Sequence, residues 1–368
     1  MKIALLNSFK KFDWILVLVV FLLILFGLVT IYSIGQNSDP ATTASFTKQL
    51  VSVGIGFALM IIFSLISFHF WKNYSVILYI VGFLLLLGVL IFGTEIGGTK
   101  GWISLFGLTF QPVEFVKLFL LFFLAYFFSK NQLNLYNFKN IIISGASVGL
   151  YLILVLLQPD MGSAIIMAFV WLGIVFFTKT KKSHLLIVTS LIVILIVCSW
   201  FFVLQDYQKS RLTTFVNPGA DPLGEGYNIT QSIIAVGSGE MFGRGLGLGP
   251  QSQLNFLPTQ ETDFIFSVIA EELGFVGAGL IVVIFALLFW RLFRILRRSS
   301  HEAFSSVFII GAIIILFSQF FINIGMNIGI MPITGLPLPF VSLAGTSIIV
   351  NLAIIGIIQS IIIHSNKH

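Results

Sequence analysis

Long runs of apolar residues, each close to the length that crosses a lipid bilayer, constrain this chain more than any other feature. A transmembrane helix needs about 20 predominantly apolar residues. These runs predict an all-α polytopic membrane protein with about ten transmembrane helices, forming a single domain over residues 1–368. They lie at roughly 14–34, 50–69, 75–94, 112–129, 140–158, 163–178, 184–204, 264–290, 304–328 and 343–364.

The composition excludes a soluble protein. Only 9% of the residues are charged and 58% are hydrophobic, whereas soluble domains carry about 25% charged residues. A net charge of +6 suggests nucleic acid in a soluble protein, but here the positive-inside rule accounts for it, so we predict no nucleic-acid partner. The single cysteine, Cys198, lies in an apolar run and excludes a disulfide framework. The first run is too long for a signal peptide and is expected to be a retained span.

The distribution of lysine and arginine predicts which way the helices run. Cytoplasmic segments of membrane proteins carry an excess of these residues. If the N-terminus is cytoplasmic, 14 of the 20 basic residues fall in cytoplasmic segments and five in outer segments, while Lys117 lies within a span. This excess predicts cytoplasmic N and C termini and therefore an even number of spans.

One long loop, residues 205–263 between the seventh and eighth runs, falls on the outer face in this orientation. Loops of such length are usually functional or disordered. This one keeps apolar residues throughout, so we expect it to fold back on the membrane surface. Asp263 ends the loop at the start of the eighth run. Its carboxylate has two compatible interpretations: a helix-capping acid, or a general base at the level of the lipid headgroups.

Four further acidic residues lie near the predicted outer face or one to two turns below it. Glu114 and Lys117 stand three residues apart inside the fourth run, which puts them on one helix face. They form either a neutralising ion pair or a site whose lysine holds a phosphate. Asp160, between the fifth and sixth runs, is either the cap of a tight turn or a second polar group near Asp263. Glu271 and Glu272 are adjacent, so we expect one of them to point into the bundle.

The Gly-rich segment 243–250 is not a nucleotide motif. It lacks the Gly-Lys-Ser/Thr ending of a P-loop and follows no predicted strand. Its one cation, Arg244, suits an anionic headgroup. The five histidines are scattered near cytoplasmic helix ends and no paired cysteines exist, so we predict no zinc site.

Several motifs, in order along most of the chain, resemble the SEDS family (shape, elongation, division and sporulation), whose members include RodA and FtsW. They are Gly98–Trp102, Phe110–Lys117, Gln158–Gly162, Gln231–Gly239, Gly243–Gly247, Phe256–Pro258, Thr262–Phe266, Ala270–Gly274, Asn323–Met326 and Gly335–Pro339 with Ser342. Segment 251–258 is more similar to the RodA branch than to the FtsW branch.

Three positions depart from the family pattern. Gly101 replaces an arginine before the loop tryptophan, where Lys100 is the candidate substitute, and Glu261 replaces a histidine. Residues 342–347 read Ser-Leu-Ala-Gly-Thr-Ser where the family usually has Ser-Tyr-Gly-Gly-Ser-Ser. The aspartate at 263 matches, so these departures affect the tuning of an activity rather than its presence.

The resemblance implies a peptidoglycan glycosyltransferase of the bacterial cytoplasmic membrane, which polymerises lipid II at its outer face for elongation or division. Asp263 would be the catalytic base. The resemblance implies no certain cofactor, although a divalent cation, Mg²⁺ or Mn²⁺, would suit the pyrophosphate; it also implies membrane lipids and a class B penicillin-binding transpeptidase as partners. The candidate substrate-binding residues are Lys117, Glu114, Lys100, Trp102, Asp160, Arg211, Arg244 and Ser342.

Two other functions remain open at this point. Intramembrane charges and the helix breaks expected at Pro159 and at 332–339 also suit a flippase for a lipid-linked cell-wall precursor. Such a transporter should gather its charges at the midplane, whereas these acids gather at the outer face. A noncatalytic scaffold for cell-wall machinery is the third possibility.

Overall fold

The computed structural model describes most of the chain, in ranges separated by short gaps. The ranges are residues 10–35, 40–96, 98–105, 108–131, 138–178, 180–202, 206–217, 219, 221, 224–299 and 302–365.

Each of the ten predicted apolar runs forms a helix. The helices are α2 (Trp14–Gly35), α3 (Pro40–Leu65), α4 (Phe68–Phe92), α5 (Pro112–Lys130), α6 (Phe138–Leu156), α7 (Met161–Phe177), α8 (Lys182–Phe202), α12 (Ile265–Arg298), α13 (Ala303–Asn327) and α14 (Gly345–His364). Among the described residues, eight helices are long and apolar enough to cross a membrane, and α7 is a shorter apolar helix. The protein is therefore a multi-pass membrane protein.

The all-α prediction omitted a small sheet. Strands β1 (Thr94–Ile96), β2 (Thr99–Leu105) and β3 (Leu108–Phe110) form an antiparallel three-stranded sheet in the order β1-β2-β3. β-Branched and aromatic residues in this stretch favour strands. A turn at Gly98, where φ is +78°, joins the first two strands and favours glycine.

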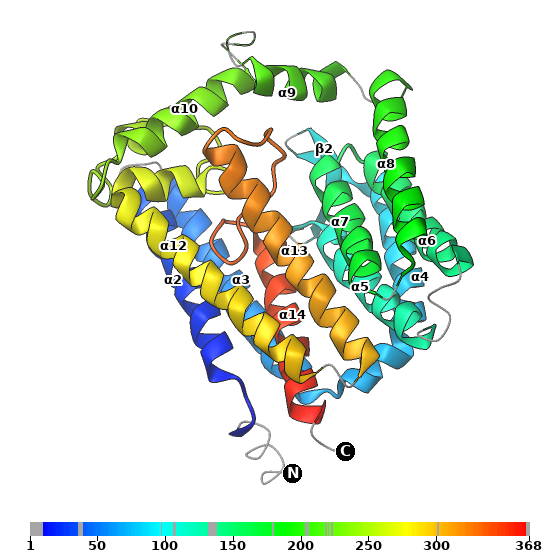
Figure 1. Ribbon diagram of the computed structural model, residues 1–368. Coiled ribbons are helices and arrows are strands. Elements are labelled where there is room, and N and C mark those ends of the chain that lie inside the picture. Colours follow the sequence, from blue (N-terminus) through cyan, green and yellow to red (C-terminus); the bar gives the residue numbers. More distant parts are fainter. Residues whose placement is uncertain are drawn as a thin grey trace.

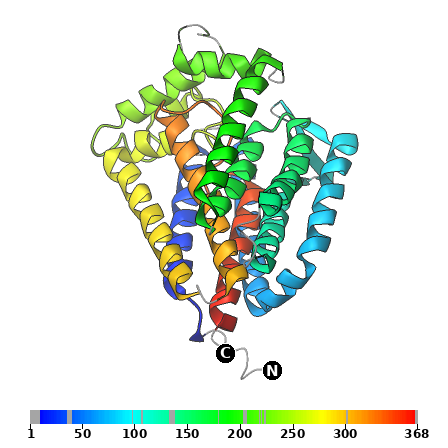
Figure 2. The same ribbon diagram turned by 45° about the vertical axis from the view of Figure 1, so that its right-hand side comes forward.

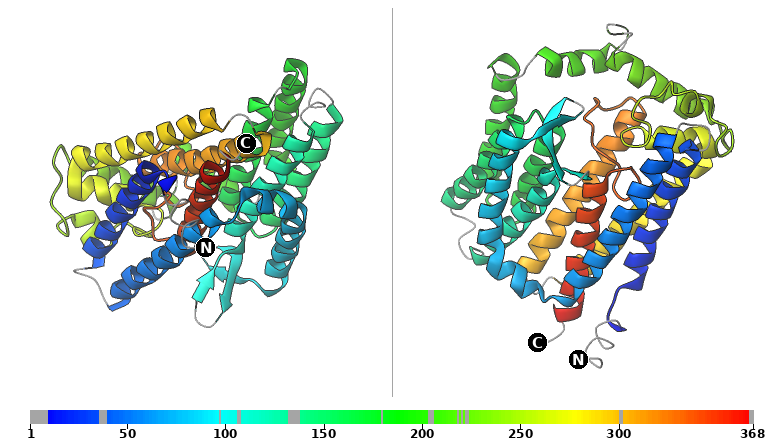
Figure 3. Two further views of the ribbon diagram at one scale, coloured as in Figure 1. Left: turned by 90° about the horizontal axis from the view of Figure 1, so that it is seen from below. Right: turned by 180° about the vertical axis from the view of Figure 1, so that it is seen from behind.

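The long loop contains helices that lie across one end of the bundle. These are α9 (Asp206–Val216), α10 (Glu225–Ser238) and the short α11 (Pro250–Gln253). In Figure 1 and Figure 2, α9 and α10 lie across the top of the bundle, above α13. The view from behind in Figure 3 places β2 at the same end, whereas α2 begins and α14 ends at the opposite end.

Helix α14 is central to the bundle and packs closely on α3. A Cβ added to Gly356 would lie 2.5 Å from the carbonyl oxygen of Met60, so the two backbones touch. Small residues permit such approaches between membrane helices. At the end away from α9 and α10, buried Asp13 pairs with Arg291 of α12 at 2.8 Å. The buried amide of Gln359 on α14 bonds the Asp13 backbone at both N–H and carbonyl.

Helix α12 is broken at Gly274, where φ is +67° and ψ is −166°. The freed peptide groups bond to the preceding loop. The N–H of Phe275 donates to the carbonyl of Glu240 at 2.8 Å, and the carbonyl of Glu272 accepts the N–H of Gly245 at 3.0 Å. Irregular backbone at a membrane helix requires such partners, because an unpaired peptide group is costly in lipid.

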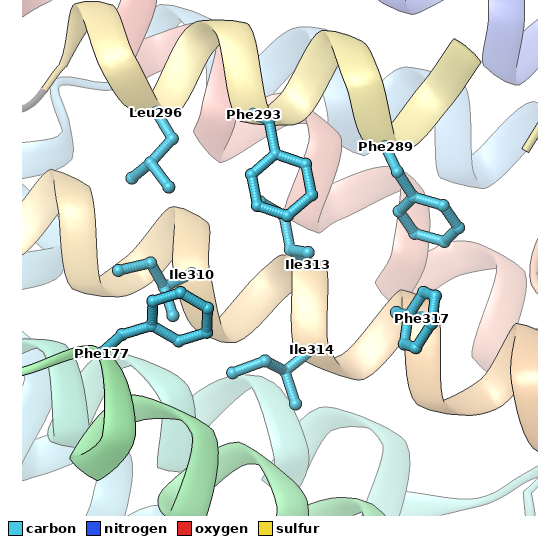
Figure 4. Close-up of a pocket in the computed structure, with 8 residues that line it drawn as sticks. All are labelled: Phe177, Phe289, Phe293, Leu296, Ile310, Ile313, Ile314 and Phe317. Carbon is cyan, nitrogen blue, oxygen red and sulfur yellow. The ribbon is translucent and has the colours of Figure 1, made fainter. Parts of the chain in front are cut away.

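An apolar cavity of about 260 Å³ lies between α7, α12 and α13. Figure 4 shows the rings of Phe289, Phe293 and Phe317 and the side chains around them. All its lining residues are hydrophobic, namely Phe177, Phe289, Phe293, Leu296, Ile310, Ile313, Ile314 and Phe317. The cavity therefore offers no group for chemistry, and the candidate site lies elsewhere.

Candidate catalytic site around Asp263

Asp263 lies on an irregular segment that leads into α12. The helix begins at Ile265 with Phe264 as its N-cap, so the capping interpretation of Asp263 is wrong. Instead, Oδ1 of Asn327 on α13 accepts the N–H of Ser267 in the first turn of α12 at 3.0 Å. Because a residue of another helix takes that role, the Asp263 carboxylate is not committed to the end of α12.

Hydrogen bonds to successive backbone carbonyls fix this segment before Asp263. The carbonyl of Glu261 accepts the N–H of Leu343 at 2.8 Å. The carbonyl of Thr262 accepts the hydroxyl of Ser342 at 2.6 Å, and the same hydroxyl accepts the N–H of Leu338 at 2.8 Å. Ser342 is buried, so it positions the backbone next to Asp263.

The carbonyl of Asp263 itself accepts two hydrogen bonds from α13. Nδ2 of Asn323 donates at 3.0 Å and Nδ2 of Asn327 donates at 2.9 Å. Asn323 also donates to the carbonyl of Leu336 at 2.8 Å. Both asparagines are fully buried. The backbone under the carboxylate is therefore held by rigid, buried amides, which is the support that a preorganised site needs.

The same network extends to the loop helix α10. The hydroxyls of Ser232 on α10 and Ser267 on α12 lie 2.6 Å apart. The Ser232 hydroxyl donates to the carbonyl of Asn327 at 2.8 Å, and Ser267 donates to Oδ1 of Asn327 at 2.6 Å. All three side chains are buried. The helix that lies across the bundle is thus tied to the support of Asp263.

The half-buried Asp263 carboxylate has an unusual acidity. Burial raises the pKa of Asp263 from 3.8 to about 6, against the opposing effects of a hydrogen bond from Thr262, the positive charge of Arg211 and a hydrogen bond from Thr259. Burial likewise raises the pKa of Glu261. A base is most effective when its pKa lies near the working pH. The structure thus brings Arg211 of α9 into the electrostatic environment of Asp263.

The predicted turn 332–339 lies between Asp263 and α7. A Cβ added to Gly335 would lie 3.9 Å from Oδ2 of Asp263, and φ is +70° at this glycine. On the other side, a Cβ added to Gly162 of α7 would lie 2.9 Å from the side chain of Leu336 and 3.0 Å from the carbonyl of Thr334. Glycine at both positions lets this turn reach Asp263 and α7 together.

Asp160 has the capping role predicted for it. It is the N-cap of α7, and Oδ1 accepts the N–H of Ser163 at 2.9 Å. Its other oxygen accepts Nε2 of Gln111 at 3.2 Å. The N–H of Gln111 in turn donates to the hydroxyl of Thr346 at 3.1 Å. Asp160 therefore joins the starts of α7, α5 and α14, on the far side of the turn from Asp263.

Glu114 and Lys117 form the predicted ion pair. Nζ of Lys117 lies 2.7 Å from Oε1 of Glu114, and both side chains are buried inside the bundle. The pair lies in the first two turns of α5, just after Gln111. Two opposite charges at this depth are costly unless paired, so each holds the other in place.

Three of the candidate substrate residues lie apart from this cluster. Nζ of Lys100 donates to the carbonyl of Leu90 near the end of α4, at 3.1 Å. Trp102 is half-buried in β2. Arg244 is exposed beside Glu240 at 4.0 Å, next to the break in α12. Their positions suit the rim of a site rather than its centre.

Glu271 and Glu272 both anchor backbone near the break in α12. The carboxylate of Glu271 accepts the N–H groups of Gln251 and Ser252, at 2.7 and 3.0 Å. The carboxylate of Glu272 accepts the hydroxyl of Ser33 on α2 at 2.8 Å. Both side chains are buried, so both point into the protein rather than one of them.

The described residues do not form a metal site of their own. Within them, no three His, Cys, Asp or Glu side chains cluster closely enough to hold a metal ion. A divalent cation bound by one or two carboxylates together with substrate phosphates would not need such a cluster.

Comparison with known proteins identifies the family. The model of the FtsW, RodA and SpoVE cell cycle proteins matches residues 13–367. The chain belongs to this family. It is the SEDS family predicted from the motifs. The chain is 35% identical to the Escherichia coli peptidoglycan glycosyltransferase MrdB, with 97% of each protein covered. It is 34% identical to stage V sporulation protein E of Bacillus subtilis, covering 95% of this chain and 96% of the relative.

Solved structures of SEDS proteins share the fold. A chain from a structure described as a peptidoglycan synthase complex that coordinates polymerization and crosslinking superposes with a TM-score of 0.84. It is 29% identical, and the match covers 97% of this chain and 99% of that one. RodA of Thermus thermophilus superposes with a TM-score of 0.71 at 27% identity, covering 97% and 98%.

Asn323 and Asn327 of this SEDS protein have roles that its sequence motifs do not predict. Their signal in the sequence is an i, i+4 pair of amides inside an otherwise apolar span, where polar residues are expensive and need partners. Only the fold reveals that the partner is the backbone of Asp263. Gln111 and Thr346 were missed for the same reason, because their contacts join distant parts of the sequence.

Proposed function

We propose that this protein is a peptidoglycan glycosyltransferase that polymerises lipid II, with Asp263 as its catalytic base. The observation that carries the proposal is the Asp263 carboxylate itself. It is half-buried, its pKa is raised to about 6, and its backbone carbonyl is held by Asn323 and Asn327. Support comes from MrdB and FtsW, relatives that are named peptidoglycan glycosyltransferases or probable ones.

The chemistry requires one base and stabilisation of a leaving pyrophosphate. The sugar 4-hydroxyl of one lipid II attacks the anomeric carbon of another in a single displacement that inverts the α-linkage to a β-linkage. As the new C–O bond forms, Asp263 accepts the hydroxyl proton and the anomeric C–O bond breaks toward the polyprenyl pyrophosphate. Lys117 and Arg211 are our candidates for stabilising that leaving charge, with Lys100 and Arg244 at the rim.

We further propose that ten helices span the membrane and that both termini are cytoplasmic. The excess of 14 basic residues over five supports this orientation. Residues 205–263 then face outward. A cysteine replacing exposed Glu240, in a protein with Cys198 replaced, should react with an impermeant maleimide in intact cells. A cysteine replacing exposed Arg298 is the matched control and should react only after lysis; the reverse pattern would invert the model.

A partner transpeptidase is part of this proposal. The solved complex with which this fold superposes is described as coordinating polymerization and crosslinking. Crosslinking is a separate reaction on the peptide stems, so a second catalytic protein must carry it out. A membrane-anchored class B penicillin-binding protein has that chemistry and acts on the same face of the membrane.

The break in α12 is the feature that would favour a flippase instead, because transporters use discontinuous helices near the midplane. Here the freed peptide groups at the break are bonded to Glu240 and Gly245 of the same chain. The break therefore anchors the loop that precedes Asp263. This use of the break favours the enzyme over the transporter.

The test is polymerisation of lipid II by purified protein in detergent. Only an enzyme makes glycan chains without a second compartment. Asp263→Asn should reduce the rate by about 10²–10⁴-fold, which is the usual contribution of a general base. The variant keeps the backbone carbonyl that Asn323 and Asn327 bind, so its melting temperature should not fall. Polymerisation at the wild-type rate by Asp263→Asn would remove Asp263 from the mechanism.

A further inference from the structure

A fully buried glutamine on α13 has no use in the mechanism above. Gln319 has 0% exposure, and neither its Nε2 nor its Oε1 has a hydrogen-bond partner among the described residues. Buried polar groups are nearly always paired, because an unpaired donor or acceptor loses its interaction with water and gains nothing. Inside a membrane bundle the same argument is stronger. Gln319 therefore needs an explanation.

The packing of α13 on α5 shows what Gln319 faces. The rings of Phe308 on α13 and Phe122 on α5 stack at 5.3 Å, and a Cβ added to Gly311 would lie 2.2 Å from the side chain of Leu121. As residue numbers rise on α13, those of its contacts on α5 fall. The two helices are therefore antiparallel, and positions can be matched by stepping away from the Gly311–Leu121 contact in both directions.

Two turns along each helix from that contact lie Gln319 and Glu114. Gln319 is eight residues after Gly311, and Glu114 is seven residues before Leu121. Seven or eight residues make about two turns and return to the same helix face, with a rise of about 1.5 Å per residue. Gln319 thus lies at the level of the Glu114–Lys117 ion pair, on the face of α13 that packs against α5.

Gln319 also belongs to a row of amides that ends at Asp263. Gln319, Asn323 and Asn327 are spaced at i, i+4 and i+8 on α13, so they follow one side of the helix. Asn323 and Asn327 hold the carbonyl of Asp263. The row connects the level of the buried ion pair to the backbone of the catalytic residue.

We propose that Gln319 is a positioning residue. Its amide donates hydrogen bonds to the Glu114 carboxylate when Lys117 leaves Glu114 to bind an anionic phosphate of the substrate. This inference rests on the proposed function. Lys117 and Glu114 hold each other in the structure, at 2.7 Å. If Lys117 left for a phosphate, the Glu114 carboxylate would become an unpaired buried charge, which is strongly unfavourable. The unpaired amide N–H groups of Gln319 lie at the level of Glu114 along the bundle. By donating hydrogen bonds to the Glu114 carboxylate, they would offset the loss of Lys117.

The decisive variant is Gln319→Leu, assayed for lipid II polymerisation and thermal melting. An apolar side chain of similar size removes two unpaired buried groups, so the melting temperature should stay the same or rise. The polymerisation rate should fall about 10- to 100-fold, because a hydrogen bond to a charged group is lost when Lys117 moves. Gln319→Glu should also lose activity, since a second carboxylate would hold Lys117 in the bundle.

Gln359→Leu is the matched control. Gln359 is equally buried, but both ends of its amide are bonded to the Asp13 backbone at the opposite end of the protein. This control should lower the melting temperature and leave the rate per folded molecule unchanged. The double variant Gln319→Leu with Lys117→Arg should lose less than the product of the single losses, because both residues act on one ion pair.

Three results would overturn the role of Gln319. The first is a normal polymerisation rate in Gln319→Leu. The second is a rate that falls only as far as the melting temperature does, in both Gln319→Leu and Gln319→Met. The third is a double variant of Gln319→Leu and Lys117→Arg whose loss of rate equals the product of the two single losses. Failure of the proposed function looks different, because the wild-type protein itself would then make no glycan from lipid II.

Discussion

Asn327 holds Asp263 and the start of α12 with the two ends of one amide. Its Nδ2 donates to the carbonyl of Asp263 at 2.9 Å, and its Oδ1 accepts the N–H of Ser267 at 3.0 Å. The catalytic residue and the first turn of the helix that follows it are therefore fixed by the same buried side chain. This arrangement makes the position of the carboxylate depend on α13.

Asn327→Ala should weaken both folding and catalysis. It removes one of the two donors to the Asp263 carbonyl and one of the two acceptors of the Ser267 N–H, whose other partners are Asn323 and the carbonyl of Phe264. Each hydrogen bond lost costs about 0.5–1.5 kcal/mol of unfolding free energy. The polymerisation rate per folded molecule should also fall, because the carboxylate is no longer held. Gln359→Ala, at the other end of the bundle, should lower the melting temperature alone. Equal rates per folded molecule in both variants would contradict the role of Asn327.

The pKa of Asp263 predicts the pH dependence of polymerisation. A base must be ionised to accept a proton, so the initial rate should rise tenfold per pH unit below about 6 and level off above it. The stability changes in the opposite direction. The folded protein holds the Asp263 proton to higher pH than the unfolded chain does, so the free energy of unfolding should decrease between pH 4 and pH 6.

Glu261 provides the control for this assignment, because burial also raises its pKa. Glu261→Gln should leave the rising limb of the pH–rate profile in place. Asp263→Asn should remove the limb together with most of the rate. A limb that disappears in Glu261→Gln and persists in Asp263→Asn would transfer the base role to Glu261.

The ion pair of α5 should matter through its charge rather than through packing. The double variant Glu114→Gln with Lys117→Met removes both partners, so no charge is stranded and the melting temperature should stay near that of the wild type. Polymerisation should nevertheless be lost, because the cation that stabilises the pyrophosphate is gone. Lys117→Arg should keep part of the activity. Near-normal glycan synthesis by the double variant would reduce the pair to a structural role.

Gly274 should not tolerate a side chain. Its φ is +67°, and an added Cβ would lie 2.3 Å from the backbone nitrogen of Gly243. We expect Gly274→Ala to lower the yield of folded protein and its melting temperature, since strain and a backbone clash combine. Gly279→Ala, on the same helix with open space around it, should be neutral or stabilising by up to about 1 kcal/mol. Similar melting curves for the two variants would contradict the left-handed backbone and the close backbone contact at Gly274.

The sequence predicts those features that depend on local pattern. Ten apolar runs predict ten helices, and the i, i+3 spacing predicts the Glu114–Lys117 ion pair. An acidic residue in the turn before a helix predicts that Asp160 caps that helix. Each of these follows from the periodicity or chemistry of a few neighbouring residues. The family motifs added Asp263, whose position alone had left a capping role open.

Features that join distant residues were not predictable in this way. Ser342 was expected to bind substrate, but its hydroxyl is bonded to the carbonyl of Thr262, 80 residues earlier. Glu271 and Glu272 are neighbours on one helix, yet both turn inward, because the backbone of the preceding loop and α2 surround that part of α12. The sheet β1–β3 was missed because its strands are short and lie between long apolar helices, whose signal dominates.

The break in α12 divides one apolar stretch into two mechanical parts. Unbroken, the 34 residues of Ile265–Arg298 would make a rod of about 50 Å, well beyond the roughly 30 Å hydrocarbon core. The part before Gly274 is bonded to Asn327 of α13 and to Gly245 of the preceding loop, and Phe275, directly after the break, is bonded to Glu240 of the same loop. The rest of the helix carries exposed apolar side chains such as Val283 and Leu287. Changes in bilayer thickness should therefore tilt the part of α12 after Gly274. The position of Asp263 relative to α13 should stay unchanged. We expect polymerisation in vesicles to vary little with acyl chain length.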